Sequence, residues 1–578
     1  MPLDGVTLRV LVGELNSKLD NGRLMKIYQP ESHTIILHFR LPGKNETLLI
    51  SADPVYPRIH TTTEQPDNPL TPPAFCMLLR KHLEPSRLLT IDQTGADRIV
   101  TLRFECYGET GQVTEKSLIF ELMGRHSNIF LINADGLIYD AIRRKPDGGS
   151  SMRVIMPGEK YIYPPDQDKI DPWTFSIDDF LTELRLLPPQ TPIWKWLQNS
   201  FQGFSKTAAQ EVVRRGNLDP SVTRSETTST DWHTLASALR SFLDELDQGG
   251  VPTWHKQGKE DLTGYALTTQ TEFELFPSVN TLADTFFTRR IRQVELGQQA
   301  NYLRRQINRH LKRVKKKEVI QENTLKEAAN ADEIRHLGEL LTANVYRIQK
   351  GQSSVEVVDY TKPEQPTVVI ELDPSLTPSQ NAQRLFKNYT KAKNAKKITA
   401  RQLKKTKQER NYLEELLLHI DLADKIETLQ EIEIELIREG YIRKPRRTTK
   451  SKQKRSRPEK YRSSDGLTIL VGRNNRQNDE LTFKTAKPNH LWFHAQNIPG
   501  SHVVVLAEGI IPETTILEAA NLAAYFSKAK SSPKVPVDYT ERRHVRKPAG
   551  AKPGFVLYDH VQTILVDPTT AVLPEKIE

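Results

Sequence analysis

The stretch LRRQINRHLKRVKKKEV (303–319) decides the architecture, because it is a highly charged segment with one narrow apolar stripe. Leu303, Ile307 and Leu311 recur at the four-residue spacing of one helix face. The helical pattern extends roughly from Leu282 to Leu341 and contains no proline. A helix this long with a single apolar stripe is typical of a helix that packs against one partner helix.

A second segment of the same kind runs roughly from Pro378 to Glu439, with no further proline and no glycine. We predict that the two segments pair as an antiparallel coiled coil over residues 279–440. Between them, VEVVDY (355–360) and TVVIEL (367–372) are β-branched runs separated by a proline-containing turn, which predicts a β-hairpin tip at about 342–376. Arms of roughly sixty residues, at about 1.5 Å per residue, would span about 80–90 Å.

The charge of the first segment is mostly of one sign. Its cations are Arg289, Arg290, Arg292, Arg304, Arg305, Arg309, Lys312, Arg313, Lys315, Lys316 and Lys317, opposed mainly by Glu295 and Glu318. One interpretation is a solvated helix face. The other is a surface for a polyanion, because a run of like charges repels itself unless opposite charge lies beside it.

Composition limits the possible classes of protein. The 578 residues suggest several domains, and 82 Lys and Arg against 72 Asp and Glu give a net charge of +10. The clustering of this excess makes nucleic acid the leading partner. Only Cys76 and Cys106 are present, which excludes a disulfide framework and a four-cysteine zinc site. The absence of a signal peptide and of an apolar run long enough to span a membrane predicts a cytoplasmic protein without membrane contact.

Residues 1–170 mix one early helix with strand signals at 34–40, 47–51, 98–106, 116–122 and 128–133, and this mixture predicts an α+β domain. Two polar clusters interrupt its strands. Asp97 and Arg98 precede IVTLRF, and ELMGRHSN (121–128) precedes IFLIN. In the second cluster Gly124 permits close backbone approach, and the following side chains supply several hydrogen-bond donors.

The chain resembles the NFACT family over nearly its whole length. The resemblance rests on MGRHSNIFLIN (123–133), LDPSLTPSQNAQRLFKNYTKAKNA (372–395) and GLTILVGRNNRQNDELTFKTA (466–486). It implies an α+β multidomain fold. The implied domains are a glycosylase-like α+β domain that binds tRNA at 1–170, a helix-hairpin-helix-like helical domain at 171–278, the coiled coil at 279–440, a basic linker at 441–460 and an α+β RNA-binding domain at 461–578.

The resemblance also implies two sets of RNA-binding residues. Those expected to contact tRNA are Asp97, Arg98, Glu121, Met123 and Arg125. Those expected to contact ribosomal RNA are Lys312, Arg313, Lys315, Lys316, Arg473, Asn474, Arg476, Arg543, Arg546 and Lys547. An arginine fork suits a phosphate, and a carboxylate can accept hydrogen bonds from a base or a ribose.

Two further segments are less decisive. GFSKTAAQEVVRRG (203–216) is either a packed helix or a turn and helix N-terminus that holds phosphate. The segment from Arg443 to Arg462 contains eleven Lys and Arg residues against Glu459, and it predicts a flexible linker that a polyanion would order.

Two other functions are possible from the sequence. A DNA glycosylase is the first, because removal of Met1 would expose Pro2 as a nucleophile; however, Leu3 stands where that pattern has an acid, and four zinc-binding cysteines are lacking. A fibronectin-binding surface adhesin is the second, which the missing signal peptide opposes. Histidines and acids near the C-terminus match no zinc spacing and single out no nucleophile, so we expect no metal, cofactor or catalytic group.

The resemblance therefore implies a factor of ribosome-associated quality control. Such a factor binds a large ribosomal subunit carrying peptidyl-tRNA, recruits alanyl-tRNA and promotes untemplated alanine addition that marks the nascent chain for degradation. Its expected partners are the subunit, tRNA, ribosomal RNA and an accessory quality-control factor. Peptidyl transfer would be done by the ribosome, so the protein would not be an enzyme.

Overall fold

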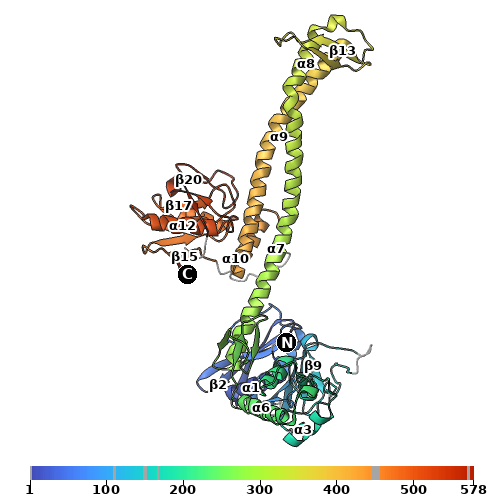
Figure 1. Cartoon of the computed structure of the whole chain (residues 1–578), viewed down its shortest axis with the longest axis vertical. Coiled ribbons are helices and arrows are strands. Elements are labelled where there is room, and N and C mark those ends of the chain that lie inside the picture. The colour runs from blue at the N-terminus through green and yellow to red at the C-terminus, as the bar shows by residue number, and fades with distance from the viewer. Residues whose placement is uncertain are drawn as a thin grey trace. The chain divides into compact units, whose positions relative to one another are not determined.

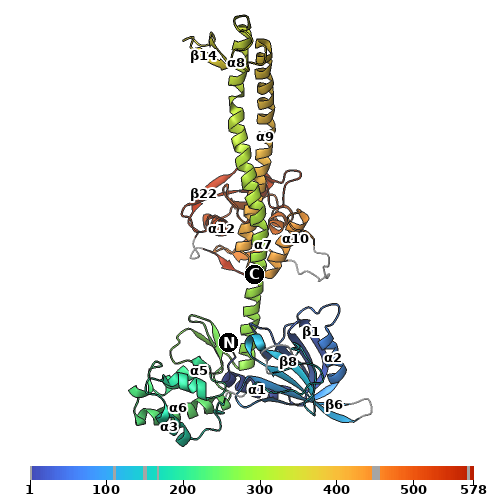
Figure 2. The same ribbon diagram turned by 90° about the vertical axis from the view of Figure 1, so that its right-hand side faces the viewer.

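The computed structural model describes residues 3–107, 112–146, 153–165, 168–444, 456–568 and 573–577. The chain divides into two compact units, Met1–Ile291 and Arg292–Glu578. Figure 1 labels their elements, and Figure 2 shows the same ribbon turned by 90°. The predicted mixture of helices and sheets in several domains is confirmed. Among the described helices, none combines the length and the apolar character needed to cross a bilayer.

The first unit is built on an antiparallel sheet with the order β4-β3-β2-β1-β5-β6-β7-β8-β9 in the described part of the chain. Its strands are β1 (Arg23–Glu31), β2 (Thr34–Leu41), β3 (Lys44–Ser51), β4 (Arg58–Thr61), β5 (Ser86–Gln93), β6 (Ile99–Tyr107), β7 (Val113–Glu121), β8 (Asn128–Asn133) and β9 (Ile138–Ala141). Helices α1 (Gly5–Leu19) and α2 (Ala74–Leu83) share a core with its apolar residues. The sequence predicted β2, β3, β6, β7 and β8 but not the other four.

The strand β1 shows why a strand was missed. RLMKIYQPE contains a proline and carries charge at both ends, and its pairing with β2 shifts register twice. Such irregularities break the alternation of apolar and polar residues that a sequence pattern requires.

The sequence predicted a helical domain at 171–278. The segment also contains strands, so this prediction is only partly correct. It contains α3 (Ile177–Leu186), α4 (Ile193–Ser200), α5 (Lys206–Arg215), η2 (Arg224–Glu226) and α6 (Ser229–Asp247), followed by the strands β10 (Thr253–His255), β11 (Asp261–Thr263) and β12 (Phe273–Leu275). These strands form a small sheet in the order β11-β10-β12 among the described residues. Strands of three residues are too short to show a periodic signal.

The predicted arms are present, but the second is shorter than expected. The first consists of α7 (Val279–Glu327), η3 (Ala328–Asn330), α8 (Ala331–Ala343) and η4 (Val345–Arg347); the second consists of α9 (Pro378–Asp421). Both views show α8 and α9 side by side (Figures 1 and 2). A break then separates α9 from α10 (Ile426–Arg438), whose Leu429, Ile432 and Leu436 pack in the same cluster as Tyr412 and Leu416 of α9. The second arm therefore does not continue to Glu439.

The seam between the arms changes character along its length. One end is aliphatic, with Leu303, Ile307 and Leu311 of α7 packed in one cluster with residues of α9 and α10. Farther along α7 the buried positions are polar, and they include Glu318 and Gln321. The seam also contains the buried Thr399 and Thr406 of α9. At the tip an apolar cluster returns beneath the hairpin of β13 (Ser354–Val358) and β14 (Thr367–Glu371).

The C-terminal domain is an antiparallel sheet in the order β22-β19-β17-β18-β16-β15-β23 among the described residues. Its elements are β15 (Glu459–Arg462), β16 (Thr468–Val471), α11 (Asn475–Glu480), the π-helical turn η5 (Leu481–Thr485), β17 (Leu491–Ala495), β18 (Val503–Leu506), α12 (Glu513–Tyr525), β19 (Val535–Glu541), η6 (Arg542–His544), β20 (Val545–Arg546), β21 (Leu557–Tyr558), β22 (Gln562–Val566) and β23 (Glu575–Lys576). Helix α12 shares a core with the sheet.

The motif at 466–486 is a strand only from Thr468 to Val471. Asn474 is the N-cap of α11, because its side-chain oxygen accepts a hydrogen bond from the backbone N–H of Gln477 at 2.9 Å. An Asn cap satisfies a backbone donor that a helix start leaves unpaired. The polar run after it therefore folds as a helical turn.

Proline at position 403 tests the continuity of α9. Leu403→Pro removes a backbone hydrogen bond in the middle of α9 and clashes with the preceding turn, which costs about 3 kcal/mol or more. We expect lower helix content and a lower unfolding temperature in far-ultraviolet circular dichroism. Leu403→Ala is the control, since it truncates the side chain and keeps the backbone bond. Equal unfolding temperatures for the two variants would contradict a continuous α9.

Candidate nucleic-acid interface

A polar cleft of about 970 Å³ lies in the first unit and contains Asp97 and Arg98. Other parts of the chain that line it include residues 3–5, residues 163–165 with Lys169, residues 198–207 with the start of α5, and residues 255–270 around β11. The cleft therefore combines the end of a sheet, a helix N-terminus and the small sheet. This volume is within the range of pockets that hold ligands.

The backbone around Asp97 and Arg98 is held rigidly before β6. The Arg98 N–H donates to the Asp97 carboxylate at 2.7 Å, and the Gln93 amide donates to the Asp97 carbonyl at 2.8 Å. The Leu122 N–H donates to the Arg98 carbonyl at 2.8 Å. Both side chains are half-buried and line the cleft. Their positions are thus fixed by the main chain, which suits a binding role.

Three lysines join Arg98 around the cleft, and the sequence did not single them out. They are Lys169, Lys206 and Lys259. Burial lowers the pKa of Lys169, and the positive charge of Arg98 lowers it further, while Asp97 opposes the shift. Lys206 lies with its ammonium 4.8 Å from the centre of the Trp194 ring. These cations are far apart in sequence, so only the fold gathers them.

The two interpretations of segment 203–216 are compatible in the structure. Helix α5 buries Ala208, Val212 and other apolar residues in the core, as simple packing requires. Its cap residue Ser205 accepts from the Ala208 N–H at 3.0 Å and lines the cleft with Lys206. A helix N-terminus carries partial positive charge and favours an anion. Binding of a phosphate at this end remains a prediction.

Glycine is required where this segment meets the N-terminal helix. The Gly5 N–H donates to the Gly203 carbonyl at 2.9 Å. Gly203 has a φ of +75°, and a Cβ there would lie 2.3 Å from the Ala96 carbonyl oxygen. A larger residue would push apart the backbones that form this wall of the cleft.

The cleft also holds acids. Asp4 accepts hydrogen bonds from the hydroxyls of Ser205 at 2.7 Å and Tyr265 at 3.0 Å. Burial raises the pKa of Asp261 to about 6, with a further contribution from the negative charge of Asp4. Met1 and Pro2, on which the glycosylase interpretation depends, lie outside the described residues.

Glu121, Met123 and Arg125 lie at the same end of the sheet as Asp97 and Arg98, because Glu121 pairs with Ile99 across β6 and β7. They are not among the residues that line the cleft. Arg125 is exposed in η1 (Gly124–His126), and Met123 is half-buried beside the apolar cluster of Ile99 and neighbouring side chains. Their contact with tRNA remains a prediction.

Glu121 has a structural environment that the sequence did not indicate. It is buried, and it accepts from the Arg153 guanidinium at 2.7 Å and from the Tyr161 hydroxyl at 2.8 Å. The ring of Tyr161 lies 5.1 Å from that of Tyr163, which lines the cleft. Glu121 can thus support the cleft wall through Tyr161.

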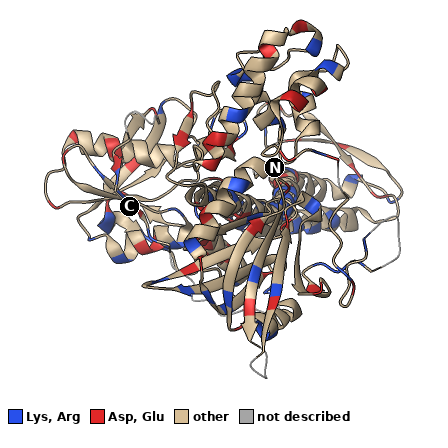
Figure 3. Cartoon of the chain, turned by 90° about the horizontal axis from the view of Figure 1, so that it is seen from below, with Lys and Arg blue, Asp and Glu red and all other residues tan. Residues whose placement is uncertain are grey.

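The predicted cations of the arm are exposed, but part of their charge is neutralised by α9. Lys312, Arg313, Lys315 and Lys316 are all exposed on α7. Lys315 forms an ion pair with Glu414 at 3.2 Å. The expectation that mainly acids of the first arm oppose this run is therefore wrong, because the antiparallel partner supplies them. Figure 3 shows basic and acidic residues along the ribbons of both units.

The predicted RNA contacts of the C-terminal domain differ in exposure. Arg473 and Asn474 are buried: Arg473 donates to the Leu422 carbonyl, and Asn474 donates to Glu431 of α10 at 2.8 Å. Arg476 is half-buried and pairs with Glu431 at 2.7 Å. These three side chains attach the domain to the base of the arm, so they are not free for RNA in this structure.

The other three predicted RNA contacts of this domain are exposed, and they are Arg543, Arg546 and Lys547. Arg543 pairs with Glu541, and Lys547 pairs with Asp479. Arg546 is exposed and makes no ion pair among the described residues. Residues 445–455 of the predicted basic linker lie outside the described residues. The prediction of a flexible linker is wrong at its C-terminal end, because Glu459–Arg462 forms β15.

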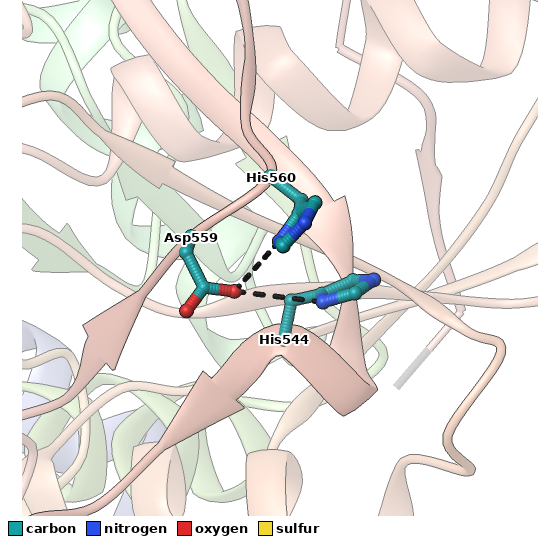
Figure 4. Close-up of side chains that lie close together, drawn as sticks. All are labelled: His544, Asp559 and His560. Atoms are coloured by element: carbon teal, nitrogen blue, oxygen red, sulfur yellow. Dashed lines mark hydrogen bonds and ion pairs between the residues drawn. The ribbon is translucent and has the colours of Figure 1, made fainter.

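His544, Asp559 and His560 form a cluster in the C-terminal domain (Figure 4). The nearest ring nitrogens of His544 and His560 lie 3.5 Å and 3.0 Å from one carboxylate oxygen of Asp559. The donor atoms are close enough together to hold a metal ion, and all three residues are at least partly exposed. Histidine nitrogens and carboxylate oxygens are among the ligands that zinc takes in proteins.

The contact between the arm and the C-terminal domain contains buried acids. Burial raises the pKa of Glu415 to about 8, and the negative charges of Glu435 and Asp479 raise it further. Burial also raises the pKa of Glu435 to about 7, although hydrogen bonds from Asn475 and Tyr412 oppose the shift. These acids hold protons near neutral pH in the folded state.

The chain matches known protein families over nearly its whole length. The family model described as NFACT N-terminal and middle domains matches residues 4–456, and the NFACT protein RNA binding domain matches residues 458–559. The chain is 40% identical over 574 residues to the Rqc2 homolog RqcH of Bacillus subtilis, which covers 98% of each chain. It is 30% identical over 195 residues to the ribosome quality control complex subunit NEMF of Mus musculus, covering 34% of this chain and 17% of that protein.

A solved structure is also similar in sequence. The C-terminal part of the fibronectin/fibrinogen-binding protein from Streptococcus suis is 39% identical, covers 49% of this chain and 99% of that one, and superposes with a TM-score of 0.40. The family models together match most of the chain, and the identity to the Bacillus subtilis protein extends over nearly its full length. The chain belongs to the NFACT family of RNA-binding proteins.

Removal of Arg153 tests the structural role of Glu121. Arg153→Met leaves a buried carboxylate without its ionic partner, and breaking such a pair costs about 3–5 kcal/mol. We expect a clearly lower unfolding temperature by calorimetry. Arg125→Met is the matched control, because it removes an exposed guanidinium from the same end of the sheet and should leave the temperature nearly unchanged. Equal effects would show that the pair does not stabilise the domain.

Glu435 should make stability depend on pH. Its folded-state pKa of about 7 exceeds the value of 4.5 expected when unfolded, so the folded state binds more protons between these values. The free energy of unfolding should therefore fall as pH rises from about 5 to about 8. Glu435→Gln keeps an oxygen that can accept from Asn475 and Tyr412, and it should flatten this dependence.

Chemical denaturation across that pH range gives the measurement. Glu433→Gln on the same helix is the control, because Glu433 lies outside the buried set and bonds Gln299 instead. The assignment fails if Glu435→Gln retains the full pH dependence of the unchanged protein.

Proposed function

We propose that this chain is a factor of ribosome-associated quality control. The observation that carries the proposal is 40% identity over 98% of both chains to the Rqc2 homolog RqcH. The similarity to the ribosome quality control complex subunit NEMF supports the same process. In this role the protein acts in the cytoplasm and binds large ribosomal subunits that still carry peptidyl-tRNA, together with an accessory quality-control factor.

The protein recruits alanyl-tRNA and promotes untemplated addition of alanine to the stalled chain. Peptidyl transfer is the chemistry of the ribosome, so the contribution of this protein is to position the substrates. Correct positioning alone lowers a reaction barrier substantially, because it removes the entropic cost of bringing reactants together. No residue of the chain is assigned a catalytic role in this proposal.

The cleft of the first unit is the proposed tRNA site. The Arg98 guanidinium can hold a phosphate through two hydrogen bonds, and Asp97 can accept from a base or a ribose hydroxyl. Lys169 and Lys206 add positive charge at the same cleft, and α5 presents its N-terminus there. A cleft that combines cations with accepting carboxylates suits a folded RNA better than a simple polyanion.

Replacement of Asp97 and Arg98 tests this site. Asp97→Ala combined with Arg98→Ala should abolish tRNA that co-purifies with the protein on large subunits, and with it the alanine tail. The fold should persist, because both side chains are half-buried and the bonds through the Arg98 and Asp97 carbonyls remain. Subunit binding should persist as well, because the arm and the C-terminal domain lie outside this cleft. Sequencing of bound RNA and mass spectrometry of the nascent chain provide the measurements.

Asp92→Ala combined with Arg103→Ala is the matched control. Asp92 and Arg103 form an exposed ion pair at 3.5 Å in the same sheet. Their replacement removes one negative and one positive charge, as the replacement of Asp97 and Arg98 does. The control should retain tRNA and tailing. If the variant at Asp97 and Arg98 keeps its tRNA, the site assignment is wrong.

A further inference from the structure

Three residues of the C-terminal domain form a compact group that the proposed function does not use. They are His544, Asp559 and His560, and Figure 4 shows their side chains turned toward one another. One donor atom of each residue lies within 4.8 Å of the donor atoms of the other two. In the described part of the chain, no second group of three His, Cys, Asp or Glu side chains comes together in this way.

The distances within the group are close to those between the ligands of a single zinc ion. Nδ1 of His560 lies 3.0 Å from Oδ1 of Asp559, and Nδ1 of His544 lies 3.5 Å from the same oxygen. Zn²⁺ takes nitrogen and oxygen ligands at about 2.0–2.2 Å in a tetrahedral arrangement, so two of its ligand atoms lie about 3.3–3.5 Å apart. Small rotations of the two imidazole rings would therefore bring all three atoms to one ion.

The main chain brings the three residues together before any ion binds. Strands β20 and β21 pair through Val545 and Tyr558, so His544 and Asp559 meet at the end of this pair. The Asp559 N–H donates to the His544 carbonyl at 3.3 Å. The group is thus closed by backbone contacts across the loop between β20 and β21, as a preorganised site requires.

The turn that carries His560 is held from below by a buried hydroxyl. Thr540 is buried in β19, and its hydroxyl lies 3.1 Å from the Asp559 carbonyl and 3.0 Å from the His560 carbonyl, to which it donates. His560 has a φ of +53°, in the left-handed region that residues other than glycine adopt infrequently. Residues held in such conformations are frequent at functional sites.

The kinds of donor select the class of ion. Two imidazole nitrogens and one carboxylate suit Zn²⁺ and neighbouring transition metals, whereas Mg²⁺ and Ca²⁺ prefer oxygen ligands. Arg546 acts on Asp559 through its positive charge and so opposes a cation. Solvent weakens this opposition, because Arg546 and Asp559 are both exposed.

We infer that His544, Asp559 and His560 bind one Zn²⁺ or a similar transition-metal ion through two imidazole nitrogens and one carboxylate oxygen. Three protein ligands leave one position of a tetrahedral ion open, and the exposure of Asp559 and His560 gives that position to water. The ion joins the residue before β20 to the turn after β21. It thereby fixes the segment that carries Arg543 and Arg546, the predicted RNA contacts on either side of His544 in the sequence.

This inference departs from the expectation of no metal, which rested on the spacing of histidines and acids in the sequence. His544 and Asp559 are separated along the chain by β20, β21 and the loop between them. Only the pairing of the two strands makes them neighbours, so no short sequence motif indicates the site.

Metal content provides the first test. The full-length protein, without a histidine tag, is treated with a chelator, dialysed against dilute Zn²⁺ and analysed by plasma mass spectrometry. We expect the unchanged protein to hold one ion per chain more than His544→Ala combined with His560→Ala. The control is His126→Ala combined with His233→Ala, which removes two exposed histidines of the first unit and should keep the ion.

Cobalt reports the arrangement of the ligands. Co²⁺ in a tetrahedral site absorbs visible light far more strongly than hydrated Co²⁺. We expect strong bands when Co²⁺ is added to the unchanged protein and their loss when Zn²⁺, but not Mg²⁺, is added afterwards. The double variant at His544 and His560 should show no such bands. Asp559→Asn, which keeps the size of the side chain, should weaken Co²⁺ binding by at least about tenfold.

Thermal unfolding gives an independent measurement. An ion that binds only the folded protein raises its unfolding temperature. Zn²⁺ should therefore raise this temperature for the unchanged protein and for the control at His126 and His233, but not for the double variant at His544 and His560. Circular dichroism without metal checks that the variants are folded, and Asp559→Asn supplies the comparison if the double variant is not.

Two results would overturn the inference. One is the absence of strong cobalt bands in the unchanged protein, and the other is an equal zinc content in the double variant and its control. The three residues would then form a hydrogen-bonded cluster only. All of these measurements use the protein without ribosomes or tRNA, so their failure would leave the proposed function unaffected.

Discussion

The second unit depends on the burial of one narrow apolar stripe between α7 and α9. Leu303 and Ile307 are fully buried against the end of α9, and α10 closes the same cluster with Leu429 and Ile432. A helix with only one apolar stripe gains little stability alone, so most of its stability must come from this packing. The C-terminal domain attaches to the helices held here, through Asn475 and Glu435 among others. This cluster therefore supports both the arm and the domain.

Beyond the aliphatic cluster the seam is held by polar contacts. Glu318 is buried and pairs with Arg410, and Thr399 and Thr406 replace the leucines that a regular coiled coil would have. Polar seam positions specify register at a cost in stability. The break at η3 lies farther along this polar part, and short 3₁₀ segments within helices commonly mark places where the helix can bend. The arm therefore has a firmly packed base and a less firmly packed middle.

Charged residues are arranged differently in the two units. In the first, cations from distant segments meet Asp4, Asp97 and Asp261 in a cleft, an arrangement that can discriminate between ligands. In the second, many cations repeat along exposed helices, an arrangement that favours a polyanion without sequence preference.

The sequence by itself determined the long helices, the hairpin tip, the mixed α/β class and the family. These depend on local periodicity, on β-branched runs and on long motifs, and all three can be read without knowing which segments meet. It also determined the excess of positive charge.

Only the tertiary structure decided which of the charged residues are available. Arg473 and Asn474 look like exposed RNA contacts in the sequence, but the domain contact buries them. Lys169 and Lys206 look unremarkable there, yet the fold brings them to Arg98. The physical reason is that exposure and ion pairing depend on neighbours far away along the chain, and a local pattern carries no information about those neighbours.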